Sequence, residues 1–180
     1  EHFLGTLIFQ RVGASSSTFE LVDGQQRLTT VFLFMVALLD QSRFHPNSSL
    51  KIAGRTFNVA QEIENFLLGE PDTAPSSKSS SAKLVPLAFL QKTFDKITDV
   101  ELSREKRLEA VPKTAKKGDR SASITLPLRR AYNHVDKKIN DHLDDFKRGS
   151  DAHLEHVYTI LRVFLEKLKV LTIHTDDLED

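Results

Sequence analysis

Cysteine is absent from the sequence of 180 residues, and apolar residues never form a long uninterrupted run. The missing thiol excludes disulfide frameworks, thiol catalysis and thiolate metal sites. The longest apolar run, Val31–Leu39, has nine residues, whereas a membrane-spanning helix needs about 20. No signal-peptide pattern opens the chain, so we expect a cytoplasmic protein with no membrane partner. The first residue is Glu1 rather than methionine, which indicates part of a longer protein.

An excess of charge of one sign is also lacking, because 25 basic residues balance 25 acidic ones. This balance excludes a uniformly cationic nucleic-acid-binding protein. The content of 39% apolar and 28% charged residues is typical of a soluble globular domain. Charge is nevertheless uneven, since Ser103–Arg130 holds nine basic and three acidic residues. This block is either a solvated surface and loop or a phosphate-facing patch. The candidate nucleic-acid-binding residues are Lys113, Lys116, Lys117 and Arg120, followed by Arg129 and Arg130.

Three segments have the character of β-strands. His2–Gln10 carries apolar side chains on both faces, so we expect both faces to be covered. Phe19–Val22 follows a stretch rich in glycine and serine and is expected to form a hairpin with the first strand. Lys169–Thr175 is predicted to be the closing strand of the sheet.

Apolar residues at helical spacing predict five main helices. Leu28–Leu39 is apolar on nearly all sides and is expected to be the buried central helix. The other helices are expected over Phe57–Leu68, Leu87–Ile97, Leu128–Leu143 and Leu154–Leu168, with a short helical turn at Arg104–Ala110.

Loops and proline complete the predicted fold. Pro127 is expected in the first turn of the fourth main helix. The serine-rich residues 70–82 are predicted to be a flexible loop, and Pro112–Ser123 a basic loop. The fold class is therefore α+β, in which a small sheet, made of an N-terminal hairpin and a C-terminal strand, packs on a helical bundle.

Histidines suggest no metal site. His153 and His156 lie three residues apart on a predicted helix, but no third ligand or zinc motif accompanies them. We therefore expect both to be exposed on a helix surface.

Polar residues crowd the junction between the second strand and the central helix, at Leu21–Thr30. A helix N-terminus presents unpaired N–H groups and a partial positive charge, which favour phosphate binding. Gly24 allows a sharp turn, and Arg27 supplies a planar fork suited to phosphate oxygens. Asp23 is a candidate Mg²⁺ ligand, and Gln25 or Gln26 is a candidate for orienting a water molecule.

A purely structural interpretation of the junction stands beside this one. In it, Asp23 caps the helix, Gly24 makes the turn, and Arg27 and the glutamines lie in solvent. The local chemistry alone leaves both interpretations open.

Residues 22–30, Val-Asp-Gly-Gln-Gln-Arg-Leu-Thr-Thr, resemble the signature of the N-terminal domain of GmrSD-type restriction proteins. His2–Ile8 is similar to the strand that this family places just upstream. Later segments at Lys83–Leu87, Arg130–Tyr132 and Leu168–Asp180 are also similar. The resemblance implies a ParB/sulfiredoxin-like fold, in which an Asp-Gly-x-x-Arg turn contacts the phosphates of a nucleotide.

The resemblance further implies a domain that binds and hydrolyses a nucleoside triphosphate. GTP is the first candidate for the nucleotide, and Mg²⁺ is the expected cofactor. It assigns catalysis to Asp23, Gln25, Gln26 and Arg27, nucleotide binding to Gly24, Arg27 and Thr29, and the metal ion to Asp23.

The implied setting is bacterial defence against phage. The implied partners are modified DNA and a His-Asn-His-type nuclease, fused or separate, and a homodimer is a further expectation. Residues 1–180 are expected to form the central part of one NTPase-like domain, because the family's Gln-Arg-x-Tyr segment upstream and its Asn-x-x-Gly turn downstream are absent. The alternative is a non-enzymatic sensor domain that binds DNA or a partner through residues 113–130.

Overall fold

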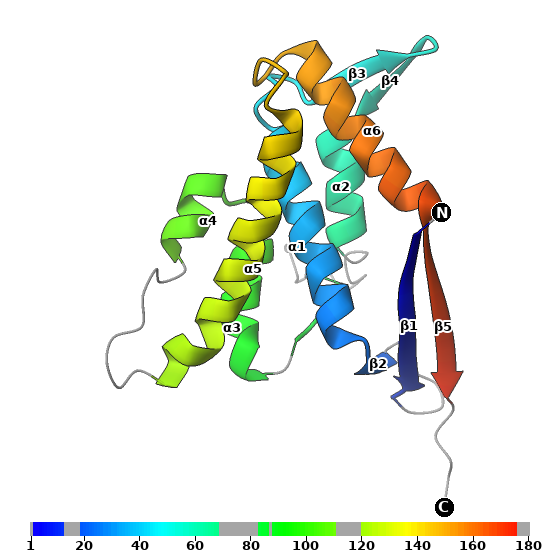
Figure 1. Cartoon of the computed structure of the whole chain (residues 1–180), viewed down its shortest axis with the longest axis vertical. Coiled ribbons are helices and arrows are strands. Elements are labelled where there is room, and N and C mark those ends of the chain that lie inside the picture. Colours follow the sequence, from blue (N-terminus) through cyan, green and yellow to red (C-terminus); the bar gives the residue numbers. More distant parts are fainter. Residues whose placement is uncertain (1, 13–18, 69–82, 87, 111–119, 176–180) are drawn as a thin grey trace, which may run out of the picture.

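The computed structural model describes residues 2–12, 19–68, 83–86, 88–110 and 120–175 (Figure 1). Strands begin and end the described part of the chain, a short hairpin follows the first helix, and helices make up most of the rest. The elements in chain order are β1 (His2–Arg11), β2 (Phe19–Asp23), α1 (Gln25–Ser42), β3 (Ser49–Ile52), β4 (Arg55–Asn58), α2 (Val59–Leu67), α3 (Ala88–Thr98), α4 (Arg104–Ala110), α5 (Arg120–Leu143), α6 (Asp151–Lys167) and β5 (Leu168–Thr175).

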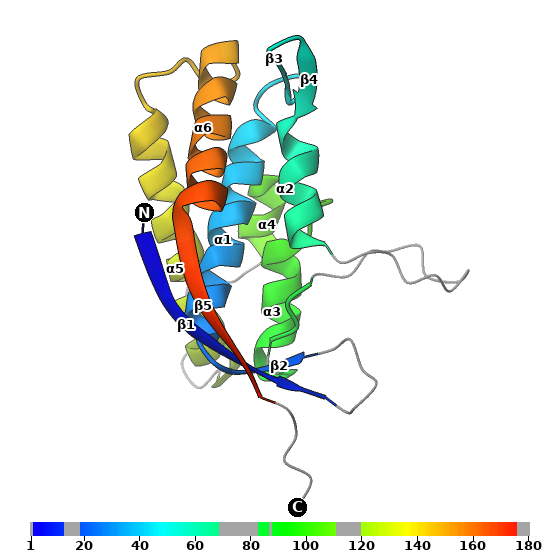
Figure 2. The same cartoon turned by 90° about the vertical axis from the view of Figure 1, so that its right-hand side faces the viewer.

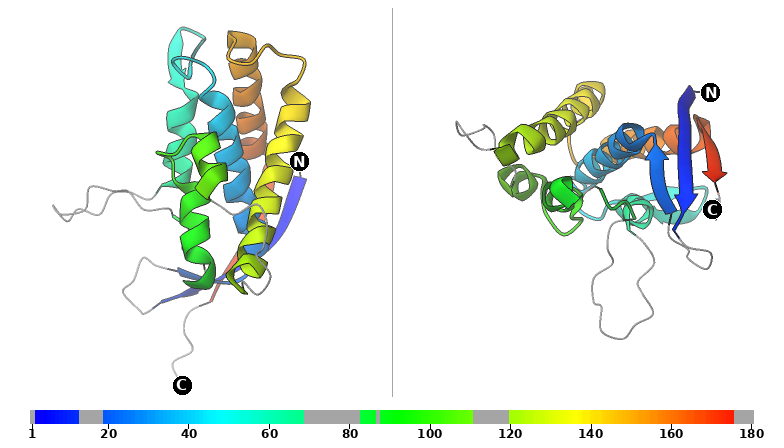
Figure 3. Two further views of the ribbon diagram at one scale, coloured as in Figure 1. Left: turned by 90° about the vertical axis from the view of Figure 1, so that its left-hand side faces the viewer. Right: turned by 90° about the horizontal axis from the view of Figure 1, so that it is seen from below.

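Helix α1 is the centre of the bundle, as its apolar sequence predicts. It contacts α2, α3, α5 and α6, and Figures 1 and 3 show these helices around it. Val36, Ala37, Leu38 and Leu39 are completely inaccessible to solvent. A helix that is enclosed on every side needs apolar side chains around its whole circumference. Among the described residues, no helix is long and apolar enough to cross a bilayer.

The main sheet has the strand order β2-β1-β5. Strand β1 pairs antiparallel with β2, which confirms the predicted hairpin, and parallel with β5, which confirms the predicted closing strand. All the helices therefore lie in the connection between two neighbouring parallel strands. The sheet lies along one side of the bundle (Figure 2), and the fold class is α+β.

The expectation that both faces of the first strand are covered is met only in part, because residues 4–10 of β1 are buried or half-buried whereas Phe3 is 67% exposed. The edge strand β5 is exposed from residue 169 to residue 175. Leu7 is 5% exposed and pairs with Thr172. Side chains alternate along a strand, so the residues on either side of Thr172 face away from Leu7. These residues, Leu171 and Ile173, are 52% and 42% exposed.

Two expected boundaries are also wrong. The second helix begins at Val59 instead of Phe57, because Phe57 belongs to β4 and pairs with Leu50 across the hairpin β3–β4, which the sequence did not predict. Helix α5 begins at Arg120, so Pro127 lies inside it instead of in its first turn, and the end of the expected basic loop is helical. A proline inside a helix removes one backbone donor and bends the helix. The serine-rich residues 70–82 lie outside the described residues.

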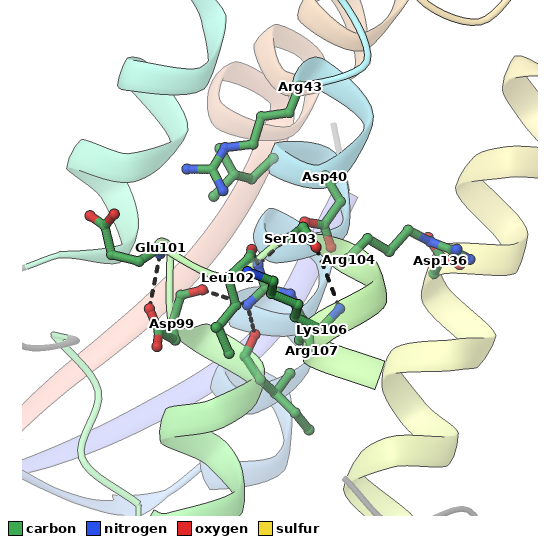
Figure 4. A network of polar contacts seen from close by, with 12 residues as sticks. Asp40, Arg43, Asp99, Glu101, Leu102, Ser103, Arg104, Lys106, Arg107 and Asp136 are labelled. Atoms are coloured by element: carbon green, nitrogen blue, oxygen red, sulfur yellow. Dashed lines mark hydrogen bonds and ion pairs between the residues drawn. The ribbon is translucent and has the colours of Figure 1, made fainter. Parts of the chain in front are cut away.

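A buried polar network joins α4 and α5 to the central helix (Figure 4). Arg107 is 1% exposed, and its Nη2 donates to Asp40 Oδ1 at 3.3 Å. The hydroxyl of Tyr132, also 1% exposed, donates to Asp40 Oδ2 at 2.5 Å. Burial raises the pKa of the Asp40 carboxyl above its usual value, against the attraction of Arg107. A buried carboxylate of this kind depends on both of its partners.

The same guanidinium group also closes the end of α3. Arg107 donates to the carbonyl oxygen of Ile97, to that of Asp99 at 2.8 Å and to that of Leu102 at 2.9 Å. The last carbonyls of a helix have no partner within the helix and need one elsewhere. Arg107 therefore fixes the corner between α3 and α4 against α1.

Replacing Arg107 by methionine is expected to lower the free energy of unfolding by about 3–5 kcal/mol, because Asp40 stays buried without its ion-pair partner. The matched control is Lys106→Met on the same helix. Lys106 is exposed, so its replacement should change the free energy of unfolding by less than about 0.5 kcal/mol. Urea unfolding followed by circular dichroism measures both values. Equal stability of the two variants would contradict the role assigned to Arg107.

Candidate functional site at the amino end of helix α1

The turn between β2 and α1 requires a glycine. Gly24 is the N-cap of α1 and has a φ of 92°, a conformation that side chains rarely adopt. A Cβ atom at this position would lie 2.3 Å from Leu7 Cδ2 and 3.1 Å from the carbonyl oxygen of Thr6. Gly24 thus lets the start of the central helix approach β1 closely, and this contact fixes the junction on the sheet.

No side chain caps the amino end of α1. The first backbone hydrogen bond runs from Leu28 N–H to the carbonyl of Gly24 at 3.0 Å, so the N–H groups of residues 25–27 precede it. The structural interpretation in which Asp23 caps the helix is therefore wrong, because Gly24 occupies the N-cap position. Uncapped N–H groups and the positive end of the helix dipole suit an anion.

The side chain of Arg27, on the first turn of α1, contacts β1 and is partly exposed to solvent. Its Nη1 donates to the carbonyl of Thr6 at 2.7 Å, and its side chain is 44% exposed. Gly5, with a φ of 114°, makes room for it, because a Cβ atom there would lie 3.1 Å from Arg27 Nε. Strand β1 therefore holds the guanidinium group in place while other N–H donors remain available.

Gly5 and Thr6 support the Arg27 side chain of the candidate site, and the sequence analysis assigned them no role there. The one available signal was the glycine in the middle of a predicted strand, which often marks a close approach of other groups.

The two glutamines differ in how they are held. Gln25 Nε2 donates to the carbonyl of Leu21 at 3.0 Å, which fixes the amide and leaves its oxygen as an acceptor. Gln26 is exposed, and its backbone carbonyl accepts from Thr30 Oγ1 at 2.8 Å. Thr29 is partly buried on the second turn. Gln25 is thus the pre-oriented amide of the pair.

Asp23 is the carboxylate of the junction. Its side chain is 61% exposed and lies 3.8 Å from Arg27 Nη1. Within the described residues, no group of three or more His, Cys, Asp or Glu side chains is placed to hold a metal ion. A Mg²⁺ ion bound beside phosphates often takes only one or two protein carboxylates, and the phosphates and water supply the other ligands. An exposed carboxylate next to an uncapped helix end fits that mode.

The candidate basic patch is only partly described by the structure. Lys113, Lys116 and Lys117 lie outside the described residues, and Arg120 is described only as the first residue of α5. Arg129 is 7% exposed, and its Nη1 donates to the carbonyl of Leu108 at 2.7 Å. The expectation that Arg129 faces phosphate is therefore wrong, because this side chain ties α5 to α4.

The fold and the junction define an α+β domain that presents an Asp-Gly-x-x-Arg turn at the open end of its central helix. The family model described as "GmrSD restriction endonuclease, N-terminal domain" matches residues 1–180. The chain therefore belongs to this family, which confirms the resemblance seen in residues 22–30 and makes it a domain of a restriction and defence protein. Curated proteins and solved structures gave no significant match, so the ParB/sulfiredoxin-like likeness stays a prediction.

Replacing Gly24 by alanine tests the close approach of α1 to β1. The strained backbone is expected to lower the free energy of unfolding by about 1 kcal/mol. The clash with Leu7 is expected to lower it by about a further 1–3 kcal/mol. Gly54→Ala is the control, because Gly54 has a φ of 80° with no atom within 4 Å of an added Cβ, and it should show the strain alone. Chemical denaturation of both variants gives the difference. Similar losses would contradict the close approach.

Proposed function

We propose that this domain binds and hydrolyses a nucleoside triphosphate at the amino end of α1, within a restriction protein that acts on modified DNA. The observation that carries the proposal is the uncapped first turn of α1 beside an arginine that is already oriented by β1. Membership of the GmrSD family supports the restriction setting. GTP is the proposed nucleotide, with Mg²⁺ as the cofactor.

Phosphate binding is assigned to the first turn and to Arg27. The backbone N–H groups of residues 25–27 donate to phosphate oxygens, and Gly24 keeps this backbone free of a side chain. Arg27 donates one N–H to Thr6 and keeps others for the phosphates. A guanidinium group held before the substrate arrives stabilises developing charge without reorganising. Thr29 lies one turn further along and completes the proposed binding residues.

Hydrolysis needs an oriented water molecule and a charge partner for the phosphates. Gln25 Oε1 is proposed to accept a hydrogen bond from the attacking water and so to orient it, since the amide is fixed through Leu21. Gln26, in the same first turn of α1, is the second candidate for orienting this water molecule. Asp23 is proposed to hold Mg²⁺ or to accept a proton. The metal ion, when bound, neutralises phosphate charge.

Nucleotide hydrolysis is proposed to control a nuclease instead of being an end in itself. The proposed partner is a His-Asn-His-type nuclease domain or subunit, which would cut DNA that carries modified bases. The sensor alternative assigns DNA or partner binding to residues 113–130. The Arg129 side chain is buried and does not face a ligand there. The sensor alternative becomes one outcome of the following experiment.

Arg27→Ala is expected to lower the rate of GTP hydrolysis by about a hundredfold, because the variant loses a pre-oriented cation at the phosphates. Arg55→Ala is the matched control, because Arg55 is exposed on the β3–β4 hairpin at the opposite end of the bundle (Figure 1). Phosphate release in the presence of Mg²⁺ gives the rates, and thermal unfolding with and without GTP gives binding.

Unchanged GTP binding and turnover in Arg27→Ala would refute the proposed nucleotide site. DNA binding that depends on salt, persists in Arg27→Ala and needs no nucleotide would favour the sensor alternative instead.

A further inference from the structure

A polar cavity of about 430 Å³ lies at the carboxyl end of α1. Since Gln41 lies 16 residues after Gln25 in α1 and a helix rises about 1.5 Å per residue, the cavity is roughly 24 Å from the proposed nucleotide site. It opens where α5 ends, the α5–α6 turn passes and α6 begins, beside the β3–β4 end of the bundle (Figure 1). The polar side chains that line it are those of Gln41, Asn140, Asp141, Asp144, Arg148 and His153.

A chain of hydrogen bonds fixes the amide groups at the wall of the cavity. Arg148 Nη2 donates to Asn140 Oδ1 at 2.7 Å, and Gln41 Nε2 donates to the same oxygen at 3.1 Å. The Asn140 amide nitrogen donates to the carbonyl of Asp136 at 2.7 Å. Turning either amide around would set two donors or two acceptors against each other. The orientation of Gln41 is therefore determined.

This orientation leaves a buried acceptor without a partner. Gln41 is 1% exposed, and its Oε1 has no hydrogen bond. His153 is also 1% exposed, and its Nδ1 has none either, so the expectation that His153 is exposed is wrong. Burial, with a contribution from the charge of Arg148, lowers the pKa of His153 and so favours the neutral ring. A buried polar atom without a partner is unfavourable, and it marks the place where a bound group would supply one.

The remaining polar side chains of the wall are carboxylates. Asp141 and Asp144 are exposed, and within the described residues neither forms a hydrogen bond or an ion pair. Gln41 and Asn140 each donate one amide hydrogen to a protein oxygen. Arg148 donates to Asn140 and lies over the Phe44 ring at 4.6 Å, and its other N–H groups remain available. The side-chain groups without any partner are nevertheless acceptors, and the two carboxylates outweigh the one guanidinium of the wall, so a matching ligand has to bring N–H donors and positive charge.

We propose that this cavity binds an organic cation, in the form of an ammonium or guanidinium group on a short aliphatic chain. The charged head donates to Gln41 Oε1 in the interior and to the carboxylate of Asp144 at the rim. The volume lies within the range of about 300–1,000 Å³ that is typical of small-molecule sites. The group comes either from a free amine or from an arginine side chain of another protein. This proposal is independent of the nucleotide site.

Agmatine, which carries both head groups, is the probe for the free amine, and the blocked peptide acetyl-Gly-Arg-Gly-amide, whose one cation is the guanidinium, is the probe for a side chain. Isothermal titration of the whole chain is expected to detect binding of at least one probe. The variant Asp144→Asn should bind that probe about fivefold more weakly, because a charge-assisted hydrogen bond is lost at a partly solvated site. Asp145→Asn removes the same charge from the neighbouring residue, which does not line the cavity, and should bind as the wild type does.

Two further arms separate the outcomes. Arg27→Ala should leave the affinity for the probes unchanged, so a failure of the nucleotide proposal does not affect this one. Stronger binding of agmatine than of the peptide identifies a free amine as the source, and the reverse identifies a protein side chain. Absence of binding of both probes at millimolar concentration overturns the proposal. Equal weakening by Asp144→Asn and Asp145→Asn, or a response to MgCl₂ alone that Asp144→Asn abolishes, also overturns it.

Discussion

The burial of α1 beyond its first turns is the constraint on which the rest of the structure depends. Its middle turns are inaccessible to solvent, so the helices α2, α3, α5 and α6 have to close around it. Only the two ends of such a helix can take part in chemistry. The amino end leaves its N–H groups uncapped beside Arg27. The carboxyl end carries the polar residues Asp40, Gln41 and Ser42 into the interior, where Asp40 is paired with Arg107 and Tyr132.

Local patterns were enough to predict the elements that carry the fold. The apolar circumference of Leu28–Leu39 predicted the central helix, and the hairpin and closing strand followed from strand patterns near both ends. The sequence did not predict the β3–β4 hairpin, because its strands have four residues each, too few for a clear alternation of apolar and polar side chains. Pro127 was misplaced because proline is more frequent in a first turn than inside a helix, and packing outweighed that preference.

The candidate site was predictable in its composition but only partly in its contacts. Residues 22–30 indicated the junction, and the family match to residues 1–180 confirmed the resemblance. The support that Gly5 and Thr6 give to Arg27 was not predictable, because it joins groups 21 positions apart. The pairing of Asp40 with Arg107 spans 67 positions. A sequence pattern carries no information on such pairs, so the buried arginines at 107 and 129 looked like surface charge.

The parallel pairing of β1 with β5 has a consequence for synthesis on the ribosome. Strand β2 pairs with β1 only from Ile8 onward, whereas Thr6, which holds Arg27, pairs with Leu171 of β5. That stretch of β1 stays without its neighbour until translation has passed residue 171, and closing so long a loop is slow. The support for the arginine is therefore completed last. A nascent or prematurely terminated chain carries the Asp-Gly-x-x-Arg turn without the strand arrangement that orients it.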